Sequence, residues 1–127
     1  MGIIKSYKDL IVWQKSIQLV KEIFILTEKV PKSELYGIVS QMRRAAISIP
    51  SNIAEAFGRR SINSSGQFYS IAYGSALELE TQLIISKELK MTEKSFFESS
   101  EFLLLEVCKM LNSMTGRIKD QQLLTNI

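Results

Sequence analysis

Histidine is absent from this sequence of 127 residues, which also has only one cysteine. Without histidine the chain lacks the Ser-His and Cys-His pairs of common hydrolases and the His-ligated sites of zinc and di-iron proteins. The single thiol, Cys108, lies near Leu104, Val107 and Leu111 in the sequence, as a small core residue does, and has no partner for an internal disulfide. We therefore expect no enzymatic activity, no bound metal and no cofactor.

The sequence has only two prolines and six glycines, too few turn-forming residues for the many turns of an all-β fold. The 46% hydrophobic and 23% charged content predicts a folded chain, and the length fits a single domain over residues 1–127. No apolar run approaches the roughly 18 residues of a membrane span, and no signal-peptide pattern occurs near the start. We expect a cytoplasmic protein without membrane contact.

Apolar residues recur at intervals of three and four, which predicts helices joined by short links. Asp9 is expected to cap the first helix, and Ser64 with Gln67 to form a capping box for the third. Gly74 is interpreted as a close-packing position rather than a break. Short links make neighbouring helices antiparallel, so we predict an all-α, antiparallel up-down-up-down four-helix bundle. The predicted helices span about residues 10–27, 34–57, 65–89 and 93–119.

The first predicted helix carries two apolar stripes, which we place on nearly opposite sides. One core would take up one stripe, and the second exceeds what a small bundle normally buries. This surplus predicts that the chain self-associates. The stripes are Leu10, Trp13, Ile17, Val20 and Phe24, and Val12, Leu19, Ile23 and Leu26.

The second predicted helix has a proline at its centre. Pro50 cannot donate to the carbonyl of Ala46, and in a helix interior this costs about 3 kcal/mol. We predict a kink near Pro50, with nearby polar side chains bonding the freed backbone groups and Glu55 pairing with Arg59. A kink that also serves subunit contacts is the favoured interpretation, and a small-molecule site is the alternative. The residues concerned are Ser48, Pro50, Ser51, Asn52 and Glu55.

Two pairs of adjacent arginines bracket this segment. Residues 1–62 hold ten basic and five acidic groups, and residues 63–127 hold six and eight. This asymmetry suits a basic face for nucleic acid, and equally suits attraction between identical subunits. The candidate nucleic-acid-binding residues are Lys15, Arg43, Arg44, Arg59 and Arg60.

Three blocks of sequence resemble a known family. They are Asp9-Leu10-x-Val12-Trp13-Gln14-Lys15, Gln41-x-Arg43-Arg44-Ala45-Ala46-x-Ser48-Ile49-Pro50-Ser51-Asn52-Ile53-Ala54-Glu55, and Ile71-Ala72-x-Gly74-Ser75-x-x-Glu78-Leu79-Glu80-Thr81-Gln82-Leu83. These blocks resemble the four helix bundle proteins encoded in intervening sequences of bacterial 23S rRNA genes. Lys90 departs from that pattern, because it stands where the family often has glycine.

The resemblance implies an antiparallel four-helix bundle and a ring-like homopentamer. The chain is also similar to the accessory variability protein of diversity-generating retroelements, a basic pentameric bundle that partners a reverse transcriptase and binds nucleic acid. The leading hypothesis is therefore a non-enzymatic homo-oligomer that binds RNA or DNA backbone, with a reverse-transcriptase-type protein as a candidate partner. The alternative is a structural or protein-interaction module whose arginines serve subunit contacts.

Overall fold

The computed structural model describes residues 2–125, and the regular structure in that range is entirely helical. The predicted all-α fold with four long helices is confirmed. The fourth helix extends several residues past its predicted end. The long helices are α1 (Ile11–Thr27), α2 (Ser40–Gly58), α3 (Ile62–Glu88) and α4 (Glu98–Thr125). Short 3₁₀ turns are η1 (Tyr7–Asp9), η2 (Lys32–Glu34) and η4 (Lys94–Phe97), and η3 (Leu35–Val39) is a π turn.

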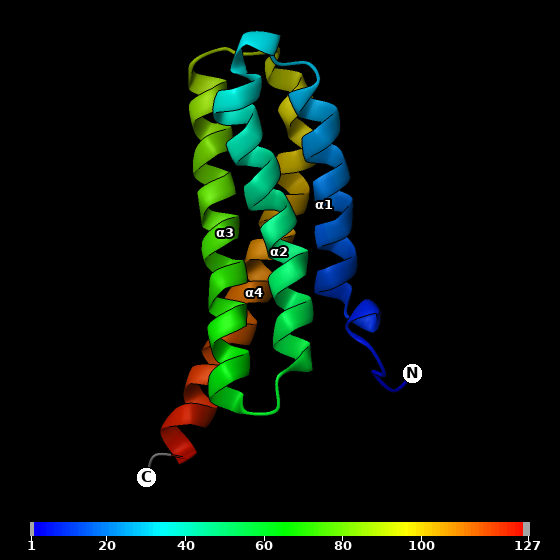
Figure 1. Cartoon of the computed structure of the whole chain (residues 1–127), viewed down its shortest axis with the longest axis vertical. Helices are drawn as coiled ribbons and strands as arrows, with labels where there is room; N and C mark the ends of the chain where they lie inside the picture. Colours follow the sequence, from blue (N-terminus) through cyan, green and yellow to red (C-terminus); the bar gives the residue numbers. More distant parts are fainter. Residues whose placement is uncertain (1, 126–127) are drawn as a thin grey trace.

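The helices form a closed bundle in which each packs on two others. In Figure 1 the chain runs upward through α1, downward through α2, upward through α3 and downward through α4. The packed pairs are α1 with α2, α2 with α3, α3 with α4, and α4 with α1. Both termini lie at one end of the bundle (Figure 1). We call this the open end (residues 2–10, 52–72 and 112–125) and the opposite one the closed end (residues 21–44 and 78–101).

One apolar stripe of α1 is buried in the core, and most of the other packs against it. Val12, Leu19, Ile23 and Leu26 are buried, while Trp13 and other members of the first stripe are partly buried against them. The stripes are flanks of one broad face, because neighbouring residues such as Val12 and Trp13 lie only about 100° apart around a helix. The prediction that the two stripes lie on nearly opposite sides was therefore wrong, while self-association of the chain stays a prediction.

Helix α1 also begins differently from the prediction. Leu10 precedes it without a side-chain cap, while the Asp9 carboxylate accepts from the backbone N–H groups of Ser6 and Lys5 and closes the turn η1. At the start of α3 the cap is Ser61, whose hydroxyl accepts from Ser64 N–H at 3.1 Å, rather than Ser64 itself. At α3 the hydroxyl three residues earlier takes the capping role, whereas α1 begins without a side-chain cap.

Helix α2 continues through Pro50, which is buried. The non-helical backbone on this side of the bundle lies earlier, at Gly37 (φ −110°, ψ −115°) within η3. The single helix predicted from about residue 34 is therefore two short turns followed by α2. A bend of the helix axis at Pro50 stays a prediction.

The glycine at which helices pack closely also differs from the one inferred from the sequence. A Cβ built on Gly74 would meet no atom within 4 Å, so close packing at this residue was wrong within the chain. The tight contact is instead at Gly66, where a Cβ would lie 2.8 Å from Cγ2 of Ile118. α3 and α4 therefore approach closely beside Gly66, at the open end.

Candidate functional site

The polar row of α2 forms a hydrogen-bonded seam with α3. The hydroxyls of Ser48 and Ser75 are 2.8 Å apart, and the Asn52 amide donates to the Ser48 hydroxyl and carbonyl at 2.9 and 2.8 Å. Ser51 donates to the carbonyl of Ile47. Among the described side chains of this row, none donates directly to the carbonyl of Ala46, and compensation of the proline defect through water stays a prediction. The row joins two helices.

A polar hollow of about 460 Å³ lies over this seam. The Gln82 amide nitrogen donates to Glu78 on its wall at 3.2 Å, while Gln82 Oε1 is buried and has no partner in the described part of the chain. An unpaired buried oxygen costs free energy unless a donor reaches it. Gln82 is not part of the lining, and the hollow itself presents one charge of each sign, Arg44 and Glu78, to a polar group from outside. Its lining is Gln41, Arg44, Ala45, Ser48, Ser75 and Glu78.

Three of the five predicted nucleic-acid-binding cations already have partners within the chain. Lys15 pairs with Glu106 across α1 and α4 at 3.0 Å. Arg43 donates to the Thr27 hydroxyl at 2.9 Å and lies over the Phe24 ring. These contacts hold both side chains along the bundle rather than directing them outward.

Arg59 forms the predicted ion pair with Glu55 at 2.9 Å and also covers the Phe68 ring. Arg44 and Arg60 are exposed and have no ion-pair partner among residues 2–125. Arg44 lies in the second turn of α2, whereas Arg60 lies in the link beyond its other end, so about 14 helical residues, or roughly 21 Å at 1.5 Å rise per residue, separate Arg44 from the end of the helix. The five candidates therefore do not converge on one shared face.

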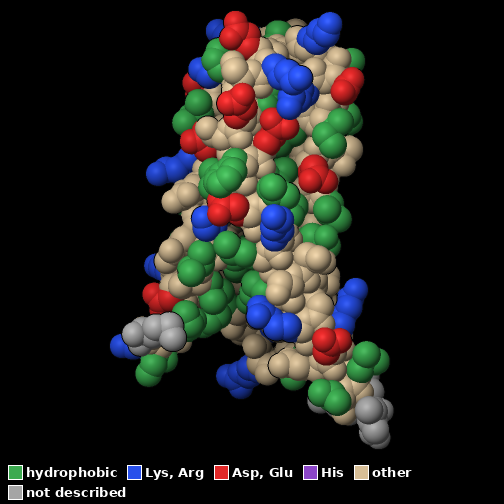
Figure 2. Space-filling model, turned by 180° about the vertical axis from the view of Figure 1, so that it is seen from behind, with side chains coloured by type: hydrophobic (Ala, Val, Ile, Leu, Met, Phe, Trp, Pro, Cys, Tyr) green, Lys and Arg blue, Asp and Glu red, His purple; other side chains and the backbone are tan. Residues whose placement is uncertain are grey.

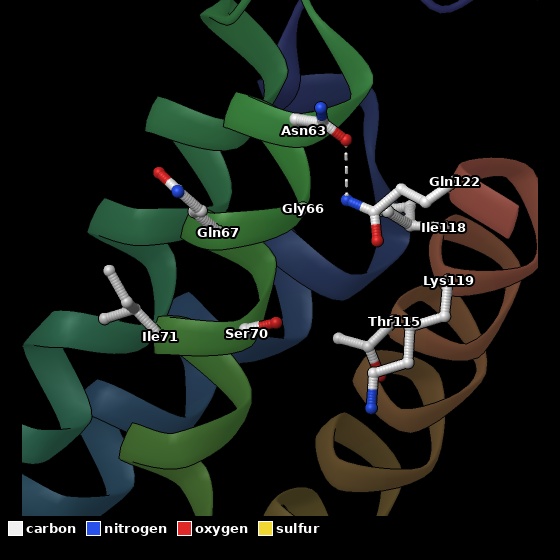
Figure 3. Close-up of a pocket in the computed structure, with 9 residues that line it drawn as sticks. All are labelled: Asn63, Gly66, Gln67, Ser70, Ile71, Thr115, Ile118, Lys119 and Gln122. Carbon is white, nitrogen blue, oxygen red and sulfur yellow. Dashed lines mark hydrogen bonds between the residues drawn. The ribbon is translucent and has the colours of Figure 1, made fainter. Parts of the chain in front are cut away.

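A second polar hollow, of about 620 Å³, lies between α3 and α4 at the open end. Figure 3 shows Ser70 from α3 and Thr115 and Lys119 from α4 directed toward the gap between these helices. At its upper edge in this view, the Gln122 amide donates to Asn63 Oδ1 at 3.0 Å (Figure 3). The lining is Asn63, Gly66, Gln67, Ser70, Ile71, Thr115, Ile118, Lys119 and Gln122, with one cation and no acid.

Sequence reasoning missed this hollow because its residues come from two segments about 50 positions apart and share no motif. The one available signal was Gly66, a glycine inside a helical period, which often marks a close approach of another helix. The link residue Arg60 precedes Asn63, in the first turn of α3, by three residues. A predicted cation and an unpredicted hollow therefore lie at the same end of the bundle.

Charge is distributed unevenly between the two ends. At the open end six of the nine charged residues are basic, whereas at the closed end eight of seventeen are basic. Figure 2 shows mixed acidic and basic side chains over the upper part of the molecule and more basic ones toward the lower part. The basic residues of the open end are Lys5, Lys8, Arg59, Arg60, Arg117 and Lys119, and the acidic ones are Asp9, Glu55 and Asp120.

The free thiol is unsuited to nucleophilic chemistry. Burial, together with the nearby negative charge of Glu80, raises the pKa of Cys108 to about 11, so it is protonated near neutral pH. Within residues 2–125 no group of three or more Cys, Asp or Glu side chains is arranged to hold a metal ion. None of the helices in that range is both long and apolar enough to cross a membrane.

Comparison with known proteins agrees with the family resemblance of the sequence blocks. The search of curated proteins found no match. A family model described as 23S rRNA-intervening sequence protein matches residues 8–113, which includes α1, α2, α3 and more than half of α4. The chain therefore belongs to the 23S rRNA-intervening sequence protein family.

Proposed function

We propose that this protein is a non-enzymatic, homo-oligomeric bundle that binds the phosphate backbone of RNA or DNA at its open end. The observation that carries this proposal is the charge imbalance between the two ends of the bundle. A basic surface attracts nucleic acid without reading its sequence, because the phosphates are the same at every position.

The hollow between α3 and α4 supports the same proposal. Lys119 supplies a cation, while Ser70 and Gln67 supply hydrogen-bond donors, and no carboxylate lines the cavity to repel a phosphate. Arg60, in the link just before α3, has no ion-pair partner among the described residues. Arg60 and Lys119 are therefore the residues to which we assign the first contacts with the backbone.

Several copies would increase affinity by presenting the same basic end repeatedly. The net charge of +3 per chain is modest, so a ring of identical subunits suits the proposal better than a monomer. By resemblance, such a ring would be a pentamer. By the same resemblance, a reverse-transcriptase-type protein is the partner class to test first.

The test is fluorescence anisotropy with labelled single-stranded and duplex RNA and DNA at rising salt. We expect binding at low salt that weakens steeply, and a slope of log K against log salt that is shallower by about one in Arg60→Glu or Lys119→Glu. Lys32→Glu, an exposed reversal in η2 at the closed end, is the matched control and should change the slope little. No binding at low salt, or equal losses in all three variants, would overturn the proposal.

The alternative is a structural or protein-interaction module, and the seam between α2 and α3 favours it. There Arg44 and Glu78 line a polar hollow over the hydrogen bond between Ser48 and Ser75. A charged side chain from another subunit could pair with either of them. Charge reversal at Arg44 separates the two functions: dissociation of the oligomer supports the module, whereas an intact oligomer with weaker nucleic-acid binding supports the first proposal.

A further inference from the structure

The polar hollow of about 460 Å³ between α2 and α3 has short side chains at its base. Ala45, Ser48 and Ser75 are part of its lining, and their small volume leaves space between the two helices. None of the lining residues belongs to the open end. This hollow is therefore separate from the surface to which we assign nucleic acid, and a ligand bound in it would be a second one.

The two serine hydroxyls at the base have one hydrogen more than their partners accept. Each hydroxyl has one hydrogen, and only one of the two is used in the 2.8 Å bond between Ser48 and Ser75. The amide nitrogen of Asn52 cannot accept the other, because it donates to Ser48 Oγ at 2.9 Å. Whichever serine donates to its neighbour, one O–H group is left without an acceptor among the described residues. Since Ser75 is only 9% exposed, the hollow is the route by which an acceptor can reach this pair.

The charged walls of the hollow face each other at about the same level of the bundle. Arg44 precedes Ser48 by four residues, which is about 6 Å along α2, and Glu78 follows Ser75 by three, which is about 4.5 Å along α3. The two helices run in opposite directions (Figure 1), so both steps lead toward the closed end. A small molecule lying on the serine pair would therefore have the guanidinium on one side and the carboxylate on the other.

Neither charge is satisfied within the chain. Arg44 has no hydrogen bond or ion pair among residues 2–125. One carboxylate oxygen of Glu78 accepts from the Gln82 amide at 3.2 Å, and the other has no donor in the described part of the chain. No ion pair joins Arg44 to Glu78, although both line the same hollow. The site therefore lacks an anionic group for Arg44 and the spare hydroxyl, and a cationic group for Glu78.

We propose that this hollow binds a small zwitterion with one carboxylate and one ammonium group, such as a free α-amino acid. The carboxylate accepts from Arg44 and from the spare serine hydroxyl, and the ammonium group donates to Glu78. Charge-assisted hydrogen bonds of this kind are about twice as strong as neutral ones. A single zwitterion supplies both charges, whereas one lysine or aspartate of another subunit would satisfy only one wall. Gln41, which also lines the hollow, is placed to contact the side chain of the amino acid.

Saturation-transfer NMR of the full chain with glycine, L-serine and L-glutamine tests the site. These probes share the ammonium and carboxylate groups and differ in side chain. We expect transfer to at least one of them at millimolar concentration. Its N-acetyl and amide derivatives each lack one charge and should bind about tenfold more weakly or worse. No transfer to any of the three, or derivatives that bind as well as the parent, would overturn the proposal.

Variants locate the binding in this hollow. We expect Arg44→Gln and Glu78→Gln each to weaken the Kd by about tenfold or more, and Ser75→Ala by a few-fold. Arg117→Gln and Glu98→Gln are matched controls, because they remove the same charges from exposed positions on α4. They should keep the wild-type Kd. Unchanged binding in Arg44→Gln and Glu78→Gln, or an equal loss in the controls, would contradict the assignment.

Two further measurements separate this proposal from the others. Arg44 and Glu78 are exposed, so circular dichroism melts of their variants should stay close to the wild type. Sedimentation equilibrium without ligand shows whether Arg44→Gln changes the mass of the assembly. A lower mass for Arg44→Gln, together with a wild type that binds no amino acid, would assign the hollow to a subunit contact and overturn the zwitterion site. Amino-acid binding is measured without nucleic acid, so its failure is distinct from failure of the proposed function.

Discussion

The two ends of the bundle are stabilised in different ways. At the closed end, large apolar side chains fill the space between the helices, including the fully buried Phe97 and the buried Val30 and Val39. At the open end the helices meet through Gly66, and a polar hollow lies between α3 and α4. Ile53 and Tyr69 are buried at the open end too, but more of the large buried apolar side chains lie at the closed end, and the open end presents a polar hollow.

Phe97→Ala should produce the largest effect on stability. Phe97 is completely buried in the core, and truncating such a residue costs about 3–5 kcal/mol of unfolding free energy. Urea denaturation followed by circular dichroism measures the loss. A cost below about 1 kcal/mol would show that the closed end does not depend on apolar packing as described.

Gly66→Ala tests the close approach of helices at the open end. The new Cβ would lie 2.8 Å from Cγ2 of Ile118, so α4 or that side chain must move, and we expect a loss of about 1–2 kcal/mol. Gly74→Ala is the matched control in the same helix. Its Cβ meets open space, so the better helix propensity of alanine should stabilise by about 0.5–1 kcal/mol. Effects of the same sign in both variants would contradict the difference between these two positions.

Lys90→Gly should stabilise the closed end. Lys90 follows α3 with a left-handed φ of 53°, and Met91 N–H bonds back to the Ser86 carbonyl at 3.0 Å. Glycine takes this conformation without Cβ strain, so we expect a gain of about 1 kcal/mol in urea denaturation. The family's frequent glycine at this position has the same physical reason. A loss of stability would mean that the lysine side chain makes a contact of its own.

At either end of the bundle, ion pairs should contribute least to the free energy of unfolding. Lys87 joins α3 to Glu101 of α4 at 2.9 Å, while Arg59 and Glu55 pair within one turn at the end of α2. We expect double-mutant cycles to give about 0.5–1 kcal/mol for the interhelical pair and about 0.3–0.5 for the other, both smaller at high salt. A larger coupling for Arg59 with Glu55 would reverse this order.

The helices could be predicted from the sequence because apolar periodicity is local. It was harder to predict which sides of α1 are buried, because its two apolar stripes flank one face rather than opposing each other. Polar side chains were least predictable. As one of two adjacent arginines, Arg43 was predicted to contact nucleic acid. In the structure it lies over the Phe24 ring and donates to Thr27 of a neighbouring helix, and such tertiary contacts cannot be predicted from local sequence. The hollow beside Lys119 likewise depends on how α3 and α4 meet at Gly66.

Hydrogen exchange with and without bound RNA tests the central claim most directly, because it reports on both ends in one experiment. The account predicts that RNA slows exchange of amides in residues 59–70 and 112–125, and leaves those of residues 28–40 and 86–98 unchanged. Protection centred on the closed end, or no protection at saturating RNA, would contradict the assignment of the open end as the nucleic-acid surface.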